Sequence, residues 1–141
     1  KAILNDQAID VYNNGDMIRD FTYVDDVVNS IIKVLVKPPK GNKSFDKLNM
    51  KPDSSWAPHM IFNVGNSNPI KLLDFLKVLE ETLCVKAKIN YLPMQSGDVK
   101  ATESDTTSLE EYINYRPSTK IKNGIEEFVT WYKEFYKFGD D

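Results

Sequence analysis

Short apolar runs along the chain predict four short strands. We expect strands at 9–12, 21–24, 61–65 and 89–92. The run at 9–12 alternates apolar and polar residues, which is the pattern of a strand with one buried face. The run at 61–65 is almost continuously apolar, which is typical of a strand buried on both faces.

Longer stretches show the three- and four-residue spacing of a helix face. The first begins at Val24, carries Asp25 and Asp26 in its first turn and ends before Pro38 and Pro39. Its apolar face consists of Val24, Val27, Val28, Ile31 and Leu35. This pattern predicts one amphipathic helix before a proline-rich stop.

Three further helices are predicted after the long loop at 38–60. One has a leucine face between 72 and 83, with Asn68 as its cap and Pro69 as its first residue. A capping box at Thr107–Glu110 predicts a short helix to about 114. The last helix should start near 120, with Thr119 as a plausible cap. Residues 1–5 resemble the end of another helix face.

The expected elements define a small mixed α/β domain with short strands and about four helices. A length of 141 residues fits a single domain covering 1–141. Loops are expected at 13–16, at 38–60 and at 93–100 around Gly97. An irregular loop as long as 38–60 is usually functional or disordered.

Composition narrows the class of partner. The net charge is −3, and no basic block could neutralise a nucleic-acid backbone, so no nucleic-acid partner is expected. No apolar run is long enough to cross a bilayer and no signal peptide is visible, so no membrane partner is expected. Cys84 is the single cysteine, which suits a reducing compartment and favours a cytoplasmic location.

Arg19 is the most informative candidate for a ligand site. A guanidinium presents a fixed fork of donors that matches phosphate oxygens, and Arg19 lies between a predicted turn and a predicted strand. An ion pair with Asp16 or Asp20 is the alternative, and from composition alone it is the more common arrangement. The residues therefore predict only a possible anion site.

Other chemistry is sparse in this sequence. Asp98, after Gly97, could accept hydrogen bonds from sugar hydroxyls, although a plain turn is the commoner explanation. His59 lies in the long loop without an obvious metal or base partner. The six glycines form no dinucleotide-binding fingerprint, and no tyrosine is followed four residues later by lysine. No catalytic residue and no metal site can be assigned.

Several motifs together resemble the C-terminal half of the extended short-chain dehydrogenase/reductase family, and within it the nucleotide-sugar epimerases. The similarity is greatest to the UDP-glucuronate 4-epimerase branch, and the order and spacing of the motifs are highly specific. The matching strings lie at 9–13, 15–28, 62–67, 92–99 and 124–136.

The resemblance implies roles for five residues. Arg19 matches the arginine on the nucleotide diphosphate, and Asp98 matches an acid that binds a ribose hydroxyl. Val11 and Tyr12 match the segment that holds uracil. Gln95 stands where many relatives have a second phosphate-binding arginine, so a two-arginine clamp is in doubt here. Cys84 stands where relatives often have a helix-ending glycine.

The resemblance further implies that this chain is the substrate-binding part of a larger NAD-dependent isomerase. NAD and the catalytic residues would lie on an N-terminal Rossmann domain that is absent here, and the fragment alone would be inactive and bind no cofactor. The reaction would interconvert UDP-glucuronate and UDP-galacturonate through a 4-keto intermediate. The full-length enzyme would be a homodimer.

Two alternatives stay open. One is the substrate domain of another enzyme of this family, such as a UDP-glucose or UDP-N-acetylhexosamine epimerase or a nucleotide-sugar dehydratase. The other is a non-catalytic nucleotide-binding module, because fold does not fix activity. The first residue, Lys1, suggests a cut chain, and a cut should expose apolar surface that promotes self-association.

Overall fold

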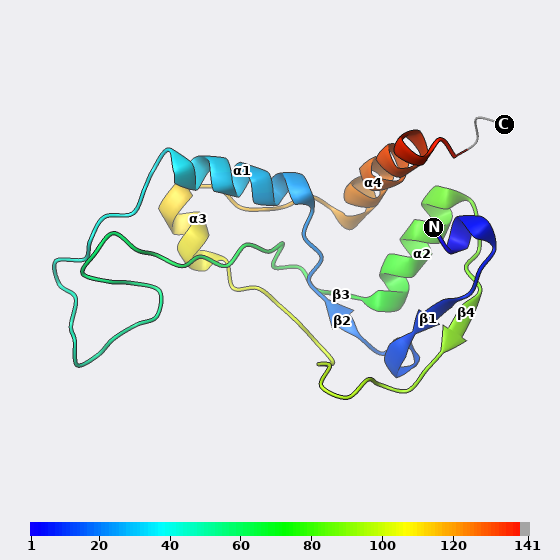
Figure 1. Ribbon diagram of the computed structural model, residues 1–141, viewed down its shortest axis with the longest axis horizontal. Coiled ribbons are helices and arrows are strands. Elements are labelled where there is room, and N and C mark those ends of the chain that lie inside the picture. Colours follow the sequence, from blue (N-terminus) through cyan, green and yellow to red (C-terminus); the bar gives the residue numbers. More distant parts are fainter. Residues whose placement is uncertain (139–141) are drawn as a thin grey trace. The chain divides into compact units, whose positions relative to one another are not determined.

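A computed structural model describes residues 1–138 of the chain, and these form two compact units (Figure 1). The first unit comprises Lys1–Phe21, Asn68–Glu103 and the described residues from Thr119 onward. The second comprises Thr22–Ser67 and Ser104–Ser118. The overall composition of helices and short strands confirms the predicted mixed α/β class, with the four expected helices present.

Two small sheets lie in the first unit. Strand β1 (Ile9–Val11) pairs in parallel with β4 (Ile89–Tyr91), so that Val11 is opposite Tyr91. Strand β2 (Ile18–Arg19) pairs antiparallel with β3 (Ile70–Lys71). The predicted strands at 9–12 and 89–92 are thus confirmed, and they become neighbours although the whole α1 and α2 region separates them in sequence.

Two helices complete the first unit, and they pack on one another. These are α2 (Leu72–Leu83) and α4 (Ile121–Tyr136), which lie side by side in Figure 1. The leucine face of α2 enters a core around Ile3, Val11 and Leu76. Burying these apolar side chains is the main stabilising term for the unit.

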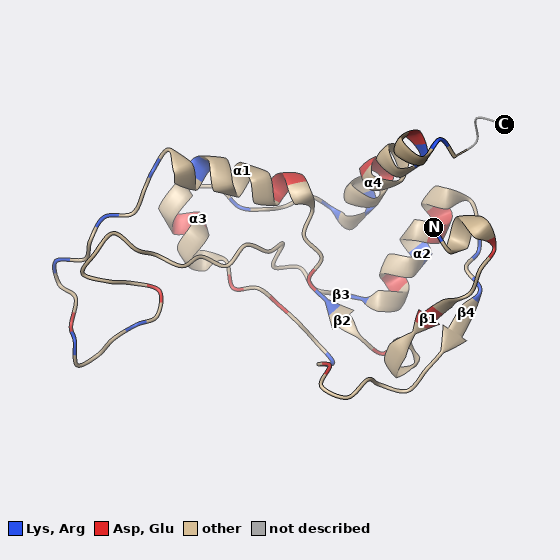
Figure 2. Ribbon diagram, in the orientation of Figure 1, with Lys and Arg blue, Asp and Glu red and all other residues tan. Residues whose placement is uncertain are grey.

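The second unit is built from α1 (Val24–Leu35) and α3 (Thr107–Ile113), which contact each other. The acids of the first turn and Lys33 near the last turn of α1 match the helix dipole (Figure 2). Leu109 of α3 is fully buried, and the hydroxyl of Tyr115 donates to Asp26 Oδ1 of α1 at 2.8 Å. The buried face of α1 is therefore partly polar.

The predicted loop at 38–60 is confirmed, since no helix or strand is assigned between α1 and β3. Its lysines and acids are distributed along the whole loop (Figure 2). Local bonds shape it, for example from Ser44 N–H to the Asn42 side chain and from Leu48 N–H to the Asp46 side chain. Such bonds are typical of turns formed by asparagine and aspartate.

The predicted strand at 21–24 is wrong. The strand lies earlier, at Ile18–Arg19, because these two residues find a hydrogen-bonding partner in β3. Phe21 instead stacks on Phe75, with ring centroids 4.2 Å apart, and Tyr23 occupies the N-cap position of α1. The apolar residues at 21–24 therefore include a packed aromatic ring and form no strand pairing.

The predicted strand at 61–65 is also wrong. Its residues have no regular structure, and Ile61 is 53% exposed. The side chain of Asn63 donates to the carbonyl of Asp105. A strand requires a neighbouring strand for its backbone groups, and none of the strands in the described residues pairs with this segment.

Three predicted helix caps are shifted. Because Ile70 and Lys71 pair with β2, α2 begins only at Leu72, with Lys71 and not Asn68 at its N-cap. The cap of α3 is Thr106, one residue before the expected Thr107, and its hydroxyl bonds Glu110 Oε1 at 2.5 Å. Helix α4 has Lys120 at its cap and not Thr119.

Candidate functional site

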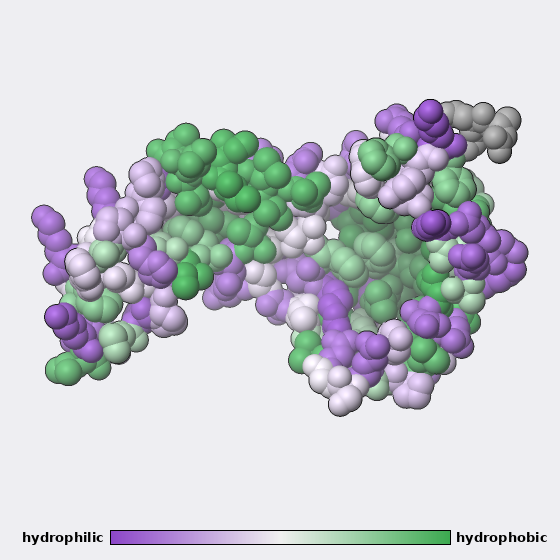
Figure 3. Space-filling model, in the orientation of Figure 1, coloured by the Kyte–Doolittle hydropathy of each residue, from purple (hydrophilic) through white to green (hydrophobic). Residues whose placement is uncertain are grey.

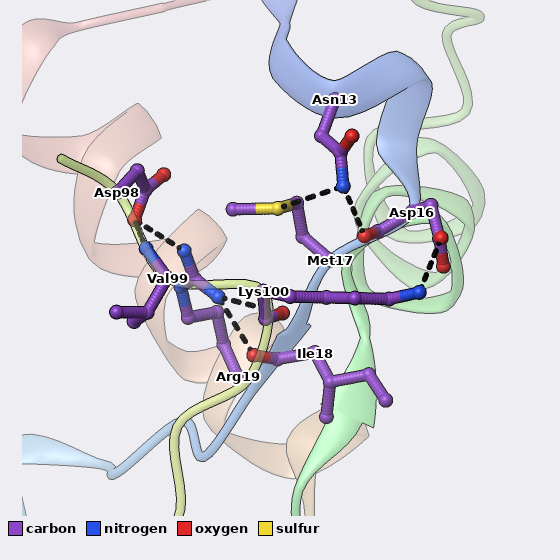
Figure 4. Close-up of polar contacts among 8 residues, drawn as sticks. All are labelled: Asn13, Asp16, Met17, Ile18, Arg19, Asp98, Val99 and Lys100. Carbon is purple, nitrogen blue, oxygen red and sulfur yellow. Dashed lines mark hydrogen bonds and ion pairs between the residues drawn. The ribbon is translucent and has the colours of Figure 1, made fainter. Parts of the chain in front are cut away.

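Arg19 lies at the end of β2, and three protein groups hold its guanidinium (Figure 4). Nη1 donates to the carbonyl of Ile18 at 2.8 Å and to the carbonyl of Lys100 at 3.2 Å. Nη2 lies 2.9 Å from Oδ1 of Asp98. The side chain is thus fixed in orientation before any ligand arrives.

Asp98 comes from the loop that follows β4. Gly97, with φ +84°, lets the chain turn tightly, and the N–H of Asp98 bonds the carbonyl of Gln95. Oδ1 of Asp98 accepts from Arg19 and also from the N–H of Val99 at 2.7 Å. The same loop continues along β2, where the N–H of Ile18 bonds the Lys100 carbonyl at 2.9 Å.

The Arg19–Asp98 pair keeps hydrogen-bonding capacity for a ligand. A guanidinium has five N–H donors, and the contacts above engage three of them. Nε–H and one Nη2–H therefore have no partner among the described residues, and neither has Oδ2 of Asp98. The side chains are 24% and 33% exposed, so solvent and ligands can reach them.

The other predicted site residues lie in the same unit. Val11 is only 4% exposed, and its carbonyl accepts from the N–H of Leu92 at 3.0 Å, so its side chain belongs to the core. Tyr12 opens the 3-10 helix Tyr12–Gly15 and is partly buried. Gln95 is exposed and lies three residues before Asp98. The structure thus joins Arg19 to the Gln95–Asp98 loop, while Val11 is hydrogen-bonded to Leu92, where this loop begins.

The turn before β2 holds further polar contacts that the sequence motifs did not indicate. Asp16, considered there as a partner of Arg19, pairs with Lys100, with 2.7 Å between Oδ2 and Nζ. The side chain of Asn13 donates to the backbone carbonyl of Asp16 at 2.7 Å (Figure 4). Asn13 and Asn14 adopt left-handed backbone conformations, which asparagine tolerates well.

Hydrogen bonds and burial shift the pKa values of several groups elsewhere in the two units. Burial, followed by the hydrogen bond to Asp26, raises the pKa of Tyr115. The hydrogen bond from Lys86 lowers the pKa of Glu80, and bonds from Thr107 lower that of Asp105. Each shift has a structural cause in its own unit.

Other kinds of site were sought in the part of the chain that the structure describes. No group of three potential metal-binding side chains converges there. None of the described helices combines the length and apolar character needed to cross a bilayer. Cys84 is exposed and caps α2 in a left-handed conformation with φ 57°. That position suits glycine, as the resemblance indicated.

Residues 1–65 match the sequence model of the NAD dependent epimerase/dehydratase family. This match and the relatives below confirm the resemblance to nucleotide-sugar epimerases that was noted in the sequence. Over 137 residues the chain is 45% identical to Protein CapI of Staphylococcus aureus, covering 97% of this chain and 41% of that protein. It is 37% identical to a probable UDP-glucuronate 4-epimerase of Rhizobium meliloti, covering 96% and 40% of the two chains.

A solved structure shows a similar fold. The UDP-glucuronic acid 4-epimerase of Bacillus cereus, in complex with UDP-glucuronic acid and NAD, superposes with a TM-score of 0.72 and 23% identity. The match covers 94% of this chain and 37% of that one. The chain therefore has the fold of part of such a protein, and it spans about two fifths of the length of these relatives.

Proposed function

We propose that the chain is the substrate-binding part of an NAD-dependent nucleotide-sugar 4-epimerase that interconverts UDP-glucuronate and UDP-galacturonate. The observation that carries this proposal is the contact between Arg19 and Asp98, which were assigned separately to the diphosphate and the ribose. In a nucleotide these two groups are covalent neighbours, so one ligand could reach both side chains. The relative from Rhizobium meliloti supports the choice of sugar.

The geometry suggests a division of roles within the pair. Nε–H and the remaining Nη2–H of Arg19 would bind diphosphate oxygens as charge-assisted donors. Oδ2 of Asp98 would accept a ribose hydroxyl while Oδ1 keeps the guanidinium in place. This arrangement preorganises both groups, which reduces the ordering cost of binding.

The uracil would lie against the segment at Val11 and Tyr12. The Val11 side chain is buried, so its role would be limited to the backbone, while the partly exposed Tyr12 offers a ring for the base. Gln95 would reach the ligand as a neutral amide from the loop that carries Asp98. Gln95 and Tyr12 would thus add contacts beyond those of the Arg19–Asp98 pair.

The chemistry at the sugar would belong to a domain outside these 141 residues. The sequence contains no glycine fingerprint for NAD and no tyrosine–lysine pair for proton transfer, so the residues present do not fit the cofactor. We therefore assign NAD and the catalytic groups to a Rossmann domain, and dimer formation to the full-length enzyme. A cytoplasmic location remains a prediction from the single cysteine.

Calorimetric titrations of this chain with uridine, UMP, UDP, UDP-glucuronate and NAD test the proposal. We expect affinity to rise from uridine to UDP, because each phosphate adds contacts to Arg19, and we expect no heat of binding with NAD. UDP-glucuronate incubated with the chain and NAD should remain unconverted. Equal binding of uridine and UDP, or tight binding of NAD, would contradict the proposed roles.

A further inference from the structure

Lys100 contacts the candidate diphosphate site with its backbone and a carboxylate with its side chain. Its carbonyl accepts from Arg19 Nη1 at 3.2 Å and from the N–H of Ile18 at 2.9 Å. Its ammonium lies 2.7 Å from Oδ2 of Asp16. Figure 4 shows the Lys100 side chain running from its backbone, which lies beside the guanidinium of Arg19, toward Asp16. The residue is therefore anchored at the site while its charge is neutralised beside it.

The two ion pairs leave no net positive charge for binding a diphosphate. Arg19 is paired with Asp98, and Lys100 is paired with Asp16, so the four charges sum to zero. A nucleotide-sugar diphosphate carries a negative charge on each phosphate, and Gln95 in the same loop is neutral. Binding two charged phosphates to a neutral cluster is electrostatically weak, because the near carboxylates repel the ligand.

We propose that Lys100 supplies the second positive charge on the diphosphate, exchanging its contact with Asp16 for a phosphate oxygen when the nucleotide binds. The side chains of Lys100 and Asp16 are 61% and 68% exposed, and exposed pairs of this kind contribute little stability, so the exchange is inexpensive. A lysine carries its ammonium on a flexible stem and binds phosphate as a point charge. This inference rests on the proposed function.

Lys71 provides a matched control in the same unit. It is the cross-strand partner of Ile18, whereas Arg19 is the next residue along β2. Side chains of successive strand residues point to opposite faces, so Lys71 lies on the face away from the guanidinium. Lys71→Met and Lys100→Met remove the same charge from the same unit, and it is Lys100 whose carbonyl accepts a hydrogen bond from Arg19.

UDP and UMP affinities measured by calorimetry on five forms of the chain test the proposal. The forms are the unaltered chain, Lys100→Met, Lys100→Arg, Lys71→Met and Asp16→Asn. We expect Lys100→Met to weaken UDP about tenfold, the value of one charge-assisted hydrogen bond, and to affect UMP less. Lys100→Arg should restore binding, and Lys71→Met should match the unaltered chain.

Asp16→Asn separates ligand binding from a structural role. If Asp16 only competes with the ligand for Lys100, this change should tighten UDP binding about threefold, because an exposed pair no longer has to be broken. If Asp16→Asn and Lys100→Met weaken UDP equally, the pair is structural and the proposal is overturned. An unchanged affinity in Lys100→Met overturns it as well.

The outcome also distinguishes this inference from the proposed function. Loss of UDP binding in Arg19→Ala together with full binding in Lys100→Met would remove only the role of Lys100. A folded, unaltered chain that does not bind UDP at all would overturn both. Circular dichroism of each form shows whether a variant retains its helices. UDP affinities are then compared only between folded forms.

Discussion

Arg19 and Asp98 are 79 residues apart in the sequence, yet Nη2 of one lies 2.9 Å from Oδ1 of the other. The contact forms because the segment after Asp98 runs along β2, with Ile18 bridged in parallel to Ala101. If Oδ2 of Asp98 binds the ribose, this carboxylate has two partners at once. We therefore expect the affinity of the chain to depend on the ribose hydroxyls of the ligand.

Asp98→Ala should remove the preference of the chain for UDP over its 2′,3′-dideoxy analogue. The expected preference is at least about tenfold, the value of a hydrogen bond to a charged acceptor. Asp10→Ala is the control, because Asp10 lies in the same unit and its carboxylate accepts from the side chain of Asn90 and not from Arg19. Competition calorimetry measures both ratios. An unchanged preference in Asp98→Ala would exclude Asp98 as the ribose ligand.

Gly15→Ala should destabilise the turn that precedes β2. Gly15 has φ +81°, and a Cβ there would lie 2.6 Å from Leu73 Cδ2. We expect the free energy of unfolding to fall by about 1–3 kcal/mol from backbone strain and overpacking. Gly97→Ala isolates the strain, because Gly97 has φ +84° with open space around it. Chemical denaturation of both variants should show the larger loss for Gly15→Ala, and equal losses would deny the clash with Leu73.

Cys84→Gly should stabilise the end of α2. Cys84 is the C-cap in a left-handed conformation, which costs a residue with a Cβ about 1 kcal/mol more than glycine. Cys84→Ala keeps the Cβ and should leave the free energy of unfolding nearly unchanged. Thermal unfolding under reducing conditions measures the difference. A gain in Cys84→Ala equal to that in Cys84→Gly would point to the thiol and not to the backbone.

The bond between Tyr115 and Asp26 should make stability depend on alkaline pH. Burial and the adjacent Asp26 raise the pKa of Tyr115 above its ordinary value of about 10, so folding favours the neutral phenol. Its contribution is fully present below pH ~10 and is lost as the pH rises through the folded-state pKa. The difference in Tm between the unaltered chain and Tyr115→Phe should therefore shrink above pH ~10. A constant difference up to pH ~12 would contradict the assignment.

The chain should self-associate through the apolar stripe of α1. Val28, Ile31 and Leu35 are 45%, 58% and 75% exposed, and Figure 3 shows a hydrophobic patch over this helix. Large exposed patches of this kind promote association. Ile31→Lys with Leu35→Lys should lower the apparent mass in light scattering, whereas Ser44→Lys in the loop should not. A monomer across a wide concentration range would contradict this prediction.

Helices were predictable because their signal is local. The faces of α1, α2 and α4 repeat along the sequence, and amphipathic spacing is sufficient to locate them. Their caps were less predictable, since the start of α2 depends on the pairing of Lys71 with Ile18. The pairing of β3 with β2, which are distant in the sequence, thus determines the residue at which α2 begins.

The strands and the site depended on partners that a one-dimensional pattern does not contain. The apolar run at 61–65 has strand composition but no edge to pair with among the described residues, while the two-residue β2 has little pattern and a partner. Arg19 and Asp98 could be named separately from their motifs, whereas their contact could not. Lys100 had no signal, because its position follows from the path of the loop along β2.

The most direct test of the account is a calorimetric titration of UDP into three forms of this chain: unaltered, Arg19→Ala and Arg116→Ala. Arg116 is the matched control, because it is the other arginine of the chain. Its Nε lies 3.6 Å from Oε1 of Glu110 in the second unit. We predict that the unaltered chain and Arg116→Ala bind UDP alike, and that Arg19→Ala loses at least ~10-fold in affinity. Equal binding by all three folded forms, or no binding by the unaltered chain, would contradict the assignment of Arg19 to the diphosphate.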